Sequence, residues 1–185
     1  SEAYRIRFQG KDSYLHDVVA NKWGVLWRHL IRRSLLQRHG IAFNPDFGAS
    51  EDYHYMVRCL YYAEKIAYVE ECLYHYNCSN SNSISTARKE STAQWYGRAT
   101  DCVEEFLERR GILPAYENDL VLRKINVKNM FLRFGIPLWN SNYPEVAGFI
   151  WKKDVEIPLK RRIVYTALVA IDIPRKIIKI LRNRV

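Results

Sequence analysis

The sequence predicts an α/β protein in which a mixed α/β region, residues 1–86, is followed by a helical region, residues 87–185. Two observations lead to this expectation. Before residue 86, short apolar and aromatic stretches lie between turn residues, which is typical of strands that alternate with short helices. After residue 86, apolar residues recur every three or four positions, which is the spacing of one buried helix face.

The first region should begin with a helix, because residues 12–22 have weak helical periodicity. The apolar and aromatic stretch 23–31 follows, and we expect it to be a strand or a buried extended segment. A short helix over residues 34–38 should end at Gly40. Glycine is the usual residue at this point, since it adopts the left-handed conformation without a steric penalty.

A second strand is expected over residues 41–43, and the turn sequence at 44–46, Asn-Pro-Asp, should end it. Ser50 then precedes a helix with a buried face, and serine is a common N-cap residue. The residues of that face are Tyr53, Met56, Val57, Leu60 and Tyr61. Residues 66–76 have the composition of an extended segment, and a polar loop follows over 77–82.

Helices are expected throughout the second region. The first covers residues 89–110 and ends at Gly111; its apolar stripe consists of Trp95, Ala99, Cys102, Val103, Phe106 and Leu107. The second covers 120–134, and the third covers 143–151. Two further helical stretches should begin at Pro158 and Pro174, because proline is favoured in the first turn of a helix.

The positive charge is concentrated at the C-terminal end. The chain carries a net charge of +9, and residues 158–185 supply +7 of it, from eight basic residues against Asp172. Those eight are Lys160, Arg161, Arg162, Arg175, Lys176, Lys179, Arg182 and Arg184. Because they alternate with isoleucine, leucine and valine, the stretch could lie on an anionic membrane face or form two ordinary packing helices. A nucleic-acid partner is not expected, since such surfaces combine basic with aromatic residues.

Composition also limits the compartment and the kind of site. The four cysteines form no Cys-x-x-Cys motif and have no histidines at zinc-ligand spacing, so we expect reduced structural thiols in a cytoplasmic protein. No signal peptide is visible. The longest apolar run, residues 163–171, is shorter than the ~20 residues that cross a bilayer, so any membrane contact should be peripheral, at the inner face.

Glu51 and Asp52 form an acidic pair in the first turn of the helix that follows Ser50. The free N–H groups and the dipole of a helix N-terminus stabilise negative charge, so both side chains should be ionised at neutral pH. One interpretation is that the pair serves helix stability alone. The other is that Asp52 acts as a general base that accepts the proton of a hydroxyl group.

Further candidates lie on either side of this pair. His75 alternates with two tyrosines on the expected extended segment, and it precedes the hydroxyl residues Ser83 and Ser85. It could be a structural histidine, or it could contact a diphosphate or complete a metal shell. Trp27, His29 and Arg32 belong to a basic and aromatic cluster that could bind phosphate, stack on a sugar ring or form a solvated face.

Four blocks in this order carry a family resemblance. They are residues 27–36, Glu51-Asp52 with the tyrosine-rich helix after it, residues 65–76, and Ser83-Ile84-Ser85. Together they resemble the C-terminal half of family 2 glycosyltransferases of the GT-A fold, most closely bacterial enzymes that build surface polysaccharides. The resemblance implies that residues 1–86 are the acceptor-side part of a GT-A-like catalytic domain.

The resemblance also implies an activity and roles for individual residues. The expected reaction is inverting transfer of a sugar from a nucleotide-sugar donor to a glycan or lipid-linked acceptor, assisted by Mg²⁺ or Mn²⁺. Asp52 matches the general base of the family, and Glu51 matches its acidic partner, which contacts the acceptor. His75 and the serine pair match positions near the donor diphosphate. His29 stands where the family often has lysine.

One departure from the family limits this expectation. Family members hold the metal with an Asp-x-Asp motif on an N-terminal nucleotide-binding half, and no two aspartates of this chain are spaced in that way. A carboxylate site for a hard divalent ion is therefore not encoded here. We expect a piece of a longer enzyme, or a decayed gene product, that lacks the donor site and is inactive by itself. The alternative from a different class is a non-catalytic membrane-surface or scaffolding module.

Overall fold

The structure is a computed structural model that describes residues 10–20, 24–71, 73–75 and 89–182, and for residues 171–182 only the course of the helix. Every regular element within these residues is a helix. In chain order they are α1 (Lys11–Val19), η2 (Leu26–Arg28), α2 (Arg33–His39), α3 (Glu51–Tyr62), α4 (Glu90–Arg109), η3 (Leu113–Tyr116), α5 (Glu117–Phe131), η4 (Leu132–Phe134), α6 (Ile136–Ser141), η5 (Pro144–Phe149) and α7 (Leu159–Arg182).

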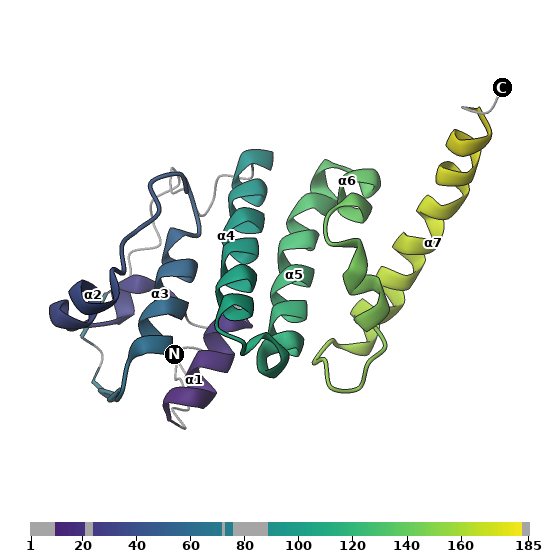
Figure 1. The fold of residues 1–185 in the computed structure, drawn as a ribbon. Coiled ribbons are helices and arrows are strands. Elements are labelled where there is room, and N and C mark those ends of the chain that lie inside the picture. Colours follow the sequence, from purple (N-terminus) through teal and green to yellow (C-terminus); the bar gives the residue numbers. More distant parts are fainter. Residues whose placement is uncertain (1–9, 21–23, 72, 76–88, 183–185) are drawn as a thin grey trace.

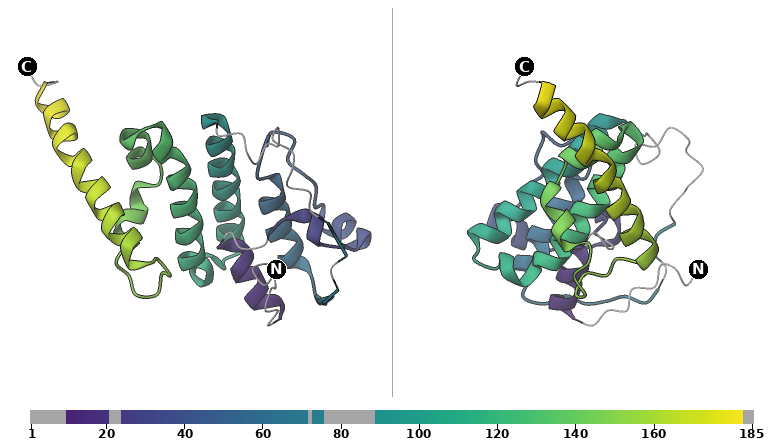
Figure 2. Two further views of the ribbon diagram at one scale, coloured as in Figure 1. Left: turned by 180° about the vertical axis from the view of Figure 1, so that it is seen from behind. Right: turned by 90° about the vertical axis from the view of Figure 1, so that its right-hand side faces the viewer.

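The helices form a row that follows the order of the chain. Helices α3, α4 and α5 stand side by side, and α1 packs against α3 and α5 (Figure 1). Helix α6 and the 3-10 turn η5 connect α5 to α7, which closes the row at the end opposite α2 (Figures 1 and 2). The C-terminal part of α7 extends beyond the rest of the protein in both views of Figure 2.

The α/β class, and with it a GT-A-like mixed region, is wrong for the part of the chain that the structure describes. The stretch 23–31 contains the helical turn η2, while 41–43 and the described part of 66–76 are irregular. The backbone is extended on either side of η2, at Val25 and His29. An extended segment becomes a strand only when a neighbouring strand pairs with its N–H and C=O groups. Composition predicts the extended backbone but does not supply the partner.

Three hydrophobic cores hold the described part of the row together, and the smallest, Ala93, Val127 and Phe131, lies between α4 and α5. The first joins α1, α3, α4 and η3 around fully buried residues such as Val57, Val103 and Leu107. The second joins α5, α6, η5 and α7 around Trp139 and Val155. Since the first core contains residues of both α3 and α4, it crosses residue 86. The predicted division of the chain at that residue stays a prediction.

Helix ends were predicted better than strands. Gly40 (φ 57°) and Gly111 (φ 69°) have the left-handed conformation that ends α2 and α4, as expected. The expectation of two helices after residue 158 is wrong, because α7 runs through Pro174 without interruption. A proline can begin a helix, but it can also lie inside one at the cost of a backbone hydrogen bond. No helix among the described residues is long and apolar enough to cross a membrane.

Candidate functional site

The acidic pair lies at the N-terminus of α3, where the sequence places it. Ser50 occupies the cap position, but its backbone is left-handed (φ 64°, ψ 19°) and its side chain makes no capping hydrogen bond. The Ser50 hydroxyl instead accepts a hydrogen bond of 2.8 Å from Nη2 of Arg123. The start of α3 is thus fixed by a residue of α5, 73 positions along the chain.

Asp52 is half-buried at this terminus, whereas Glu51 is exposed. Burial raises the pKa of Asp52 above its ordinary value of 3.8, and the charge of Glu51 raises it further. The backbone N–H of Tyr53 and the positive charge of Arg123 act in the opposite direction without cancelling the rise. The folded protein therefore disfavours the charged form of Asp52, although a helix N-terminus alone would favour it.

Arg123 makes the buried polar contacts near Asp52. Its side chain is 1% exposed, and Nε donates a hydrogen bond of 3.0 Å to Oγ1 of Thr100 on α4. The guanidinium lies over the ring of Tyr53, 3.9 Å from the ring centroid. Burial lowers the pKa of Arg123, and the surrounding tyrosines and Asp52 oppose this effect. One side chain of α5 is therefore bonded to α4 and to the residue that precedes α3.

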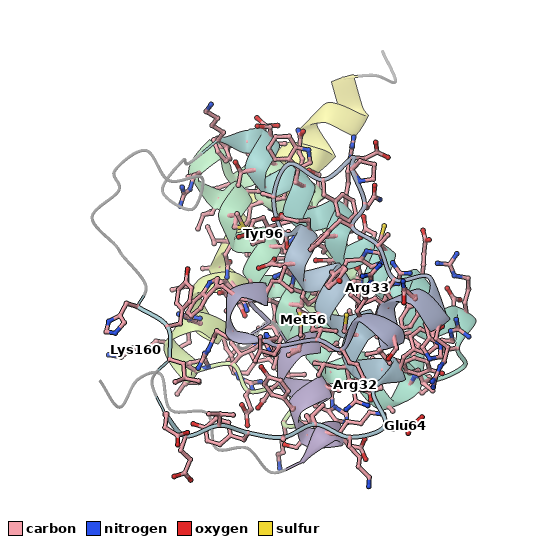
Figure 3. All side chains as sticks on the ribbon, turned by 90° about the vertical axis from the view of Figure 1, so that its left-hand side faces the viewer. Arg32, Arg33, Met56, Glu64, Tyr96 and Lys160 are labelled. Carbon is pink, nitrogen blue, oxygen red and sulfur yellow. The ribbon has the colours of Figure 1, made fainter. Side chains whose placement is uncertain are left out.

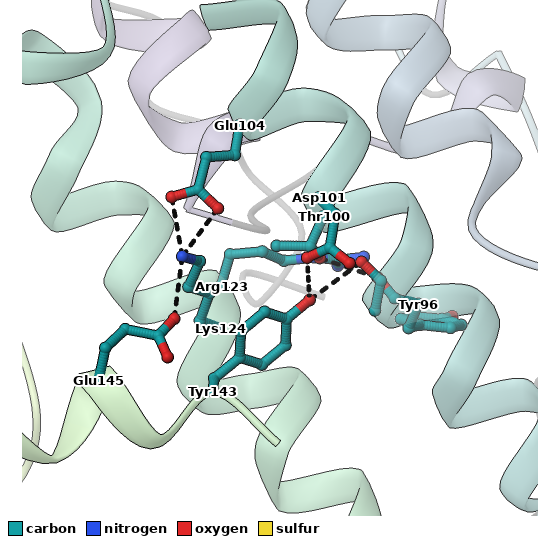
Figure 4. Close-up of polar contacts among 9 residues, drawn as sticks. Tyr96, Thr100, Asp101, Glu104, Arg123, Lys124, Tyr143 and Glu145 are labelled. Carbon is teal, nitrogen blue, oxygen red and sulfur yellow. Dashed lines mark hydrogen bonds and ion pairs between the residues drawn. The ribbon is translucent and has the colours of Figure 1, made fainter. Parts of the chain in front are cut away.

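A second group of polar contacts lies beside Arg123 (Figure 4). The Tyr143 hydroxyl lies 2.7 Å from Oδ1 of Asp101, to which it donates, and 3.0 Å from the carbonyl oxygen of Gly97. Tyr143 has φ 48°, an uncommon backbone conformation for a tyrosine. Burial raises the pKa of Asp101, and the hydrogen bond from Tyr143 lowers it by less. Like Asp52, Asp101 is a carboxylate whose charge is disfavoured by its surroundings.

A shallow, open pocket of about 290 Å³ lies against this second group of contacts. Its lining is polar except for two rings, and consists of Gln94, Gly97, Arg98, Asp101, Phe131, Ser141, Asn142 and Tyr143. Amide, guanidinium and carboxylate groups beside aromatic rings suit a small hydroxylated ligand. Asp52 is not among the residues that line this pocket.

His29 is held inside the protein by both ring nitrogens. Nδ1 donates to the carbonyl oxygen of Val25 at 2.8 Å, and Nε2 lies 2.7 Å from the hydroxyl of Tyr14. Because a carbonyl can only accept, Nδ1 carries a proton, and in the neutral ring Nε2 accepts the proton of the tyrosine hydroxyl. Burial lowers the pKa of His29 and is the largest influence on it. His29 thus links η2 to α1 through its hydrogen bond with Tyr14.

The other predicted binding residues lie around η2 and the segment 73–75. Trp27 is 39% exposed and stacks on Tyr74, with 4.6 Å between ring centroids. This contact brings the neighbourhood of η2 close to His75, which is exposed. Arg32 is exposed at the start of α2 (Figure 3). Ser83 and Ser85 lie outside the described residues.

The structure does not supply a metal site to go with His75. Among the described residues, no group of three histidine, cysteine, aspartate or glutamate side chains is placed to hold a metal ion. No described group is therefore assigned to the divalent cation that the family resemblance implies. A metal role for His75 stays a prediction.

Sequence reasoning missed the buried basic residues of α5. It predicted a helix over 120–134 from apolar positions alone, and Arg123 and Lys124 were not considered. Both are buried. They lie between Leu120 and Val127 on the stripe that faces the core. Basic residues that interrupt an apolar stripe could have indicated buried charges at these positions.

Lys124 is bonded to two carboxylates from different elements. Nζ donates to Glu104 at 2.8 Å and to Glu145 at 3.0 Å. Burial alone would lower the pKa of Lys124, but the two carboxylates outweigh it and the net shift is upward.

We expect Lys124→Met to lower the free energy of unfolding at pH 7 by about 1–2 kcal/mol, because both half-exposed glutamates lose their partner. Urea denaturation measures this, with exposed Lys65→Met as the control; an equal loss in both variants would contradict it.

Because of His54 on α3, we expect the free energy of unfolding to fall in mild acid. Burial lowers its pKa from 6.5 to about 4, and the charges of Arg58 and Arg109 add to the effect. The neutral ring is favoured in the folded state, so the stability it contributes is present above about pH 6.5 and is lost as the pH falls toward 4. We expect His54→Gln to reduce the slope of unfolding free energy against pH between these values. Unchanged slopes in denaturation series at pH 7, 5.5 and 4 would refute this.

Comparison with known proteins gives one similarity. Residues of this chain are 28% identical over 118 positions to the protein named "Putative glycosyltransferase EpsH" of Bacillus subtilis (strain 168). The match covers 60% of this chain and 33% of that protein, so the chain spans about a third of its relative's length. The similarity supports a relationship to glycosyltransferases. It does not extend to family 2 or to the GT-A fold. No protein-family model matches the chain, and no solved structure matches it.

Proposed function

We propose that this chain contributes the acceptor-activating side of a glycosyltransferase that moves a sugar from a nucleotide donor to an acceptor hydroxyl. Two findings support the proposal. One is the sequence similarity to a protein named as a glycosyltransferase. The other, which carries the mechanism, is the raised pKa of Asp52, a half-buried carboxylate at the N-terminus of α3. A carboxylate whose charge is disfavoured is a stronger base than an ordinary aspartate.

In the proposed reaction Asp52 accepts the proton of the acceptor hydroxyl. The acceptor oxygen forms its bond to the anomeric carbon from the face opposite the nucleotide diphosphate. The bond from that carbon to the diphosphate oxygen breaks at the same time, so the anomeric configuration inverts and the nucleoside diphosphate leaves. The raised pKa eases the proton transfer, and the backbone N–H of Tyr53 helps to orient the carboxylate.

Other residues have supporting roles in this proposal. The exposed Glu51 would contact the acceptor, and its charge also contributes to the raised pKa of Asp52. Trp27 and Tyr74 stack on each other and are both exposed, so a sugar ring could contact this aromatic pair. His29 instead positions η2, because both of its nitrogens are bonded within the chain. Since the described residues hold no metal cluster, no step of the reaction is assigned to a metal.

The test is a transfer assay on the complete polypeptide that contains these residues. Nucleotide release is measured with uridine, thymidine and guanosine diphosphate sugars, with and without glycan or lipid-linked acceptors, in Mg²⁺ and in Mn²⁺. We expect one donor class to be used, release to increase with acceptor, and the product to have the inverted anomeric configuration by NMR. A complete polypeptide that releases nucleotide from no donor would overturn the proposal and favour the non-catalytic alternative.

A further inference from the structure

Over residues 159–170, the part of α7 whose side chains the structure describes, the helix has two apolar faces, and one of them is covered. The inner face carries Tyr165, which is buried in the second core, and Leu168 and Val169, which pack against it. The Leu168 carbonyl also accepts a hydrogen bond from Asn140 of α6. These contacts fix the N-terminal half of α7 to the row of helices.

The outer face of the same helical turns is exposed and mostly apolar, and Lys160 lies on it in the first turn. Leu159, Ile163 and Val164 are 63%, 56% and 52% exposed, and Ala167 and Ala170 continue the surface on the next turns. Residues at these spacings share one side of a helix. An apolar side that continues over three turns in contact with water marks an interaction surface.

An indole ring extends this outer face sideways. Trp151 is 55% exposed, and its Nε1 donates a hydrogen bond of 2.9 Å to Oγ1 of Thr166 in the middle of α7. The bond places the ring beside the apolar face and satisfies the indole N–H. Tryptophan with an apolar body and a bonded polar edge is the side chain most enriched at the boundary between lipid and water.

The charges around this face select the partner. Lys152, Lys153, Lys160 and Arg161 are exposed on it or beside it, against Asp154 and Glu156 in the same loop. Over residues 158–185 eight basic residues stand against one acidic residue, so the segment carries +7. A second copy of α7 would bring the same charge and would be repelled. An aliphatic face with a basic border suits anionic lipid, whereas nucleic acid would require polar or aromatic contacts.

We propose that the outer face of α7, with Trp151 beside it, binds the surface of a membrane that contains anionic phospholipid. The helix is about 36 Å long and projects from the end of the row, so it can lie along a surface without moving the cores (Figure 2). Its apolar face enters the boundary of the acyl chains, and its basic residues contact the lipid phosphates. The proposal does not depend on the glycosyltransferase activity.

The test is co-sedimentation of the chain with vesicles of phosphatidylcholine alone or with 30% phosphatidylglycerol. We expect binding to the anionic vesicles that weakens between 0.1 and 0.5 M NaCl, since salt screens the basic residues. The double variant Ile163→Glu, Val164→Glu should bind at least tenfold more weakly, because two apolar side chains no longer enter the lipid.

The matched control is Leu30→Glu, Val69→Glu. These two residues are also large, apolar and exposed, but they lie away from α7 near α2 and in the segment after α3. The control should bind anionic vesicles as the unchanged chain does. Equal loss in both double variants, or no binding to anionic vesicles, would overturn the proposal. A dimer in sedimentation equilibrium that the α7 variant alone disrupts would also overturn it and assign the face to a second copy.

Discussion

Replacing Arg123 by methionine is expected to lower the free energy of unfolding by about 3–4 kcal/mol. The variant loses two hydrogen bonds from a charged donor, to Ser50 and Thr100, each of which contributes about 1.5–3 kcal/mol. It also loses the contact of the guanidinium with the Tyr53 ring. The methionine variant also avoids the free-energy cost of burying a charge. The expected loss of stability is therefore smaller than the summed contributions of the lost contacts. Urea denaturation followed by circular dichroism measures the change.

Two further variants show whether the effect belongs to the geometry of Arg123. Lysine keeps the positive charge, but it lacks the planar guanidinium that donates to the hydroxyls of both Ser50 and Thr100. Arg123→Lys should therefore lower the free energy of unfolding by roughly half as much as Arg123→Met. Arg133→Met removes a positive charge from an exposed position just after α5 and should change stability by less than about 0.5 kcal/mol. If Arg123→Met is as stable as Arg133→Met, the buried contacts do not hold the start of α3.

Replacing Asp52 by asparagine is expected to reduce sugar transfer by the complete polypeptide by about 10²–10⁴-fold, the usual contribution of a general base. Asparagine has nearly the same shape and still accepts the Tyr53 N–H, so binding of the donor should not change. The Asp46→Asn variant removes an exposed carboxylate six residues earlier and should retain full transfer. Normal transfer by Asp52→Asn would remove this residue from the mechanism.

The same Asp52 variant is expected to gain stability at neutral pH. A carboxyl group whose folded pKa is raised stabilises the protein below its unfolded pKa and loses that stabilisation as the pH rises through the folded pKa. Asp52→Asn removes the unfavourable charge, so its melting temperature should exceed that of the unchanged chain at pH 7. The difference should shrink below pH 4. A lower melting temperature at pH 7 would mean that Asp52 serves helix stability instead.

The sequence predicted much of the helical structure because local spacing determines which helix face is buried. The apolar stripe of α4 and the glycines that end α2 and α4 are cases in which neighbours along the chain suffice. The strands failed because pairing depends on a second segment, and within the described residues none pairs with 66–71 or 73–75. The continuous α7 was missed because proline is compatible with both the start and the interior of a helix.

The place of the acidic pair in the fold was predicted, but the electrostatics around it were not. The acidic pair lies in the first turn of α3, as the pattern after Ser50 indicated. The raised pKa of Asp52 could not be predicted, because its burial arises from packing between helices that are distant in sequence. The sequence predicted that the Ser50 hydroxyl caps α3. It is instead bonded to Arg123, a contact that also depends on packing between distant helices.

The most direct test of this account is the titration of the Asp52 carboxyl group by ¹³C NMR. We expect a midpoint above the ordinary value of 3.8, and a lower midpoint in Glu51→Gln, where the neighbouring negative charge is removed. The Asp46 carboxyl group, read in the same spectra, serves as the exposed reference. A midpoint for Asp52 at or below 3.8 would show that the helix terminus stabilises its charge, and would contradict the proposed role as a base.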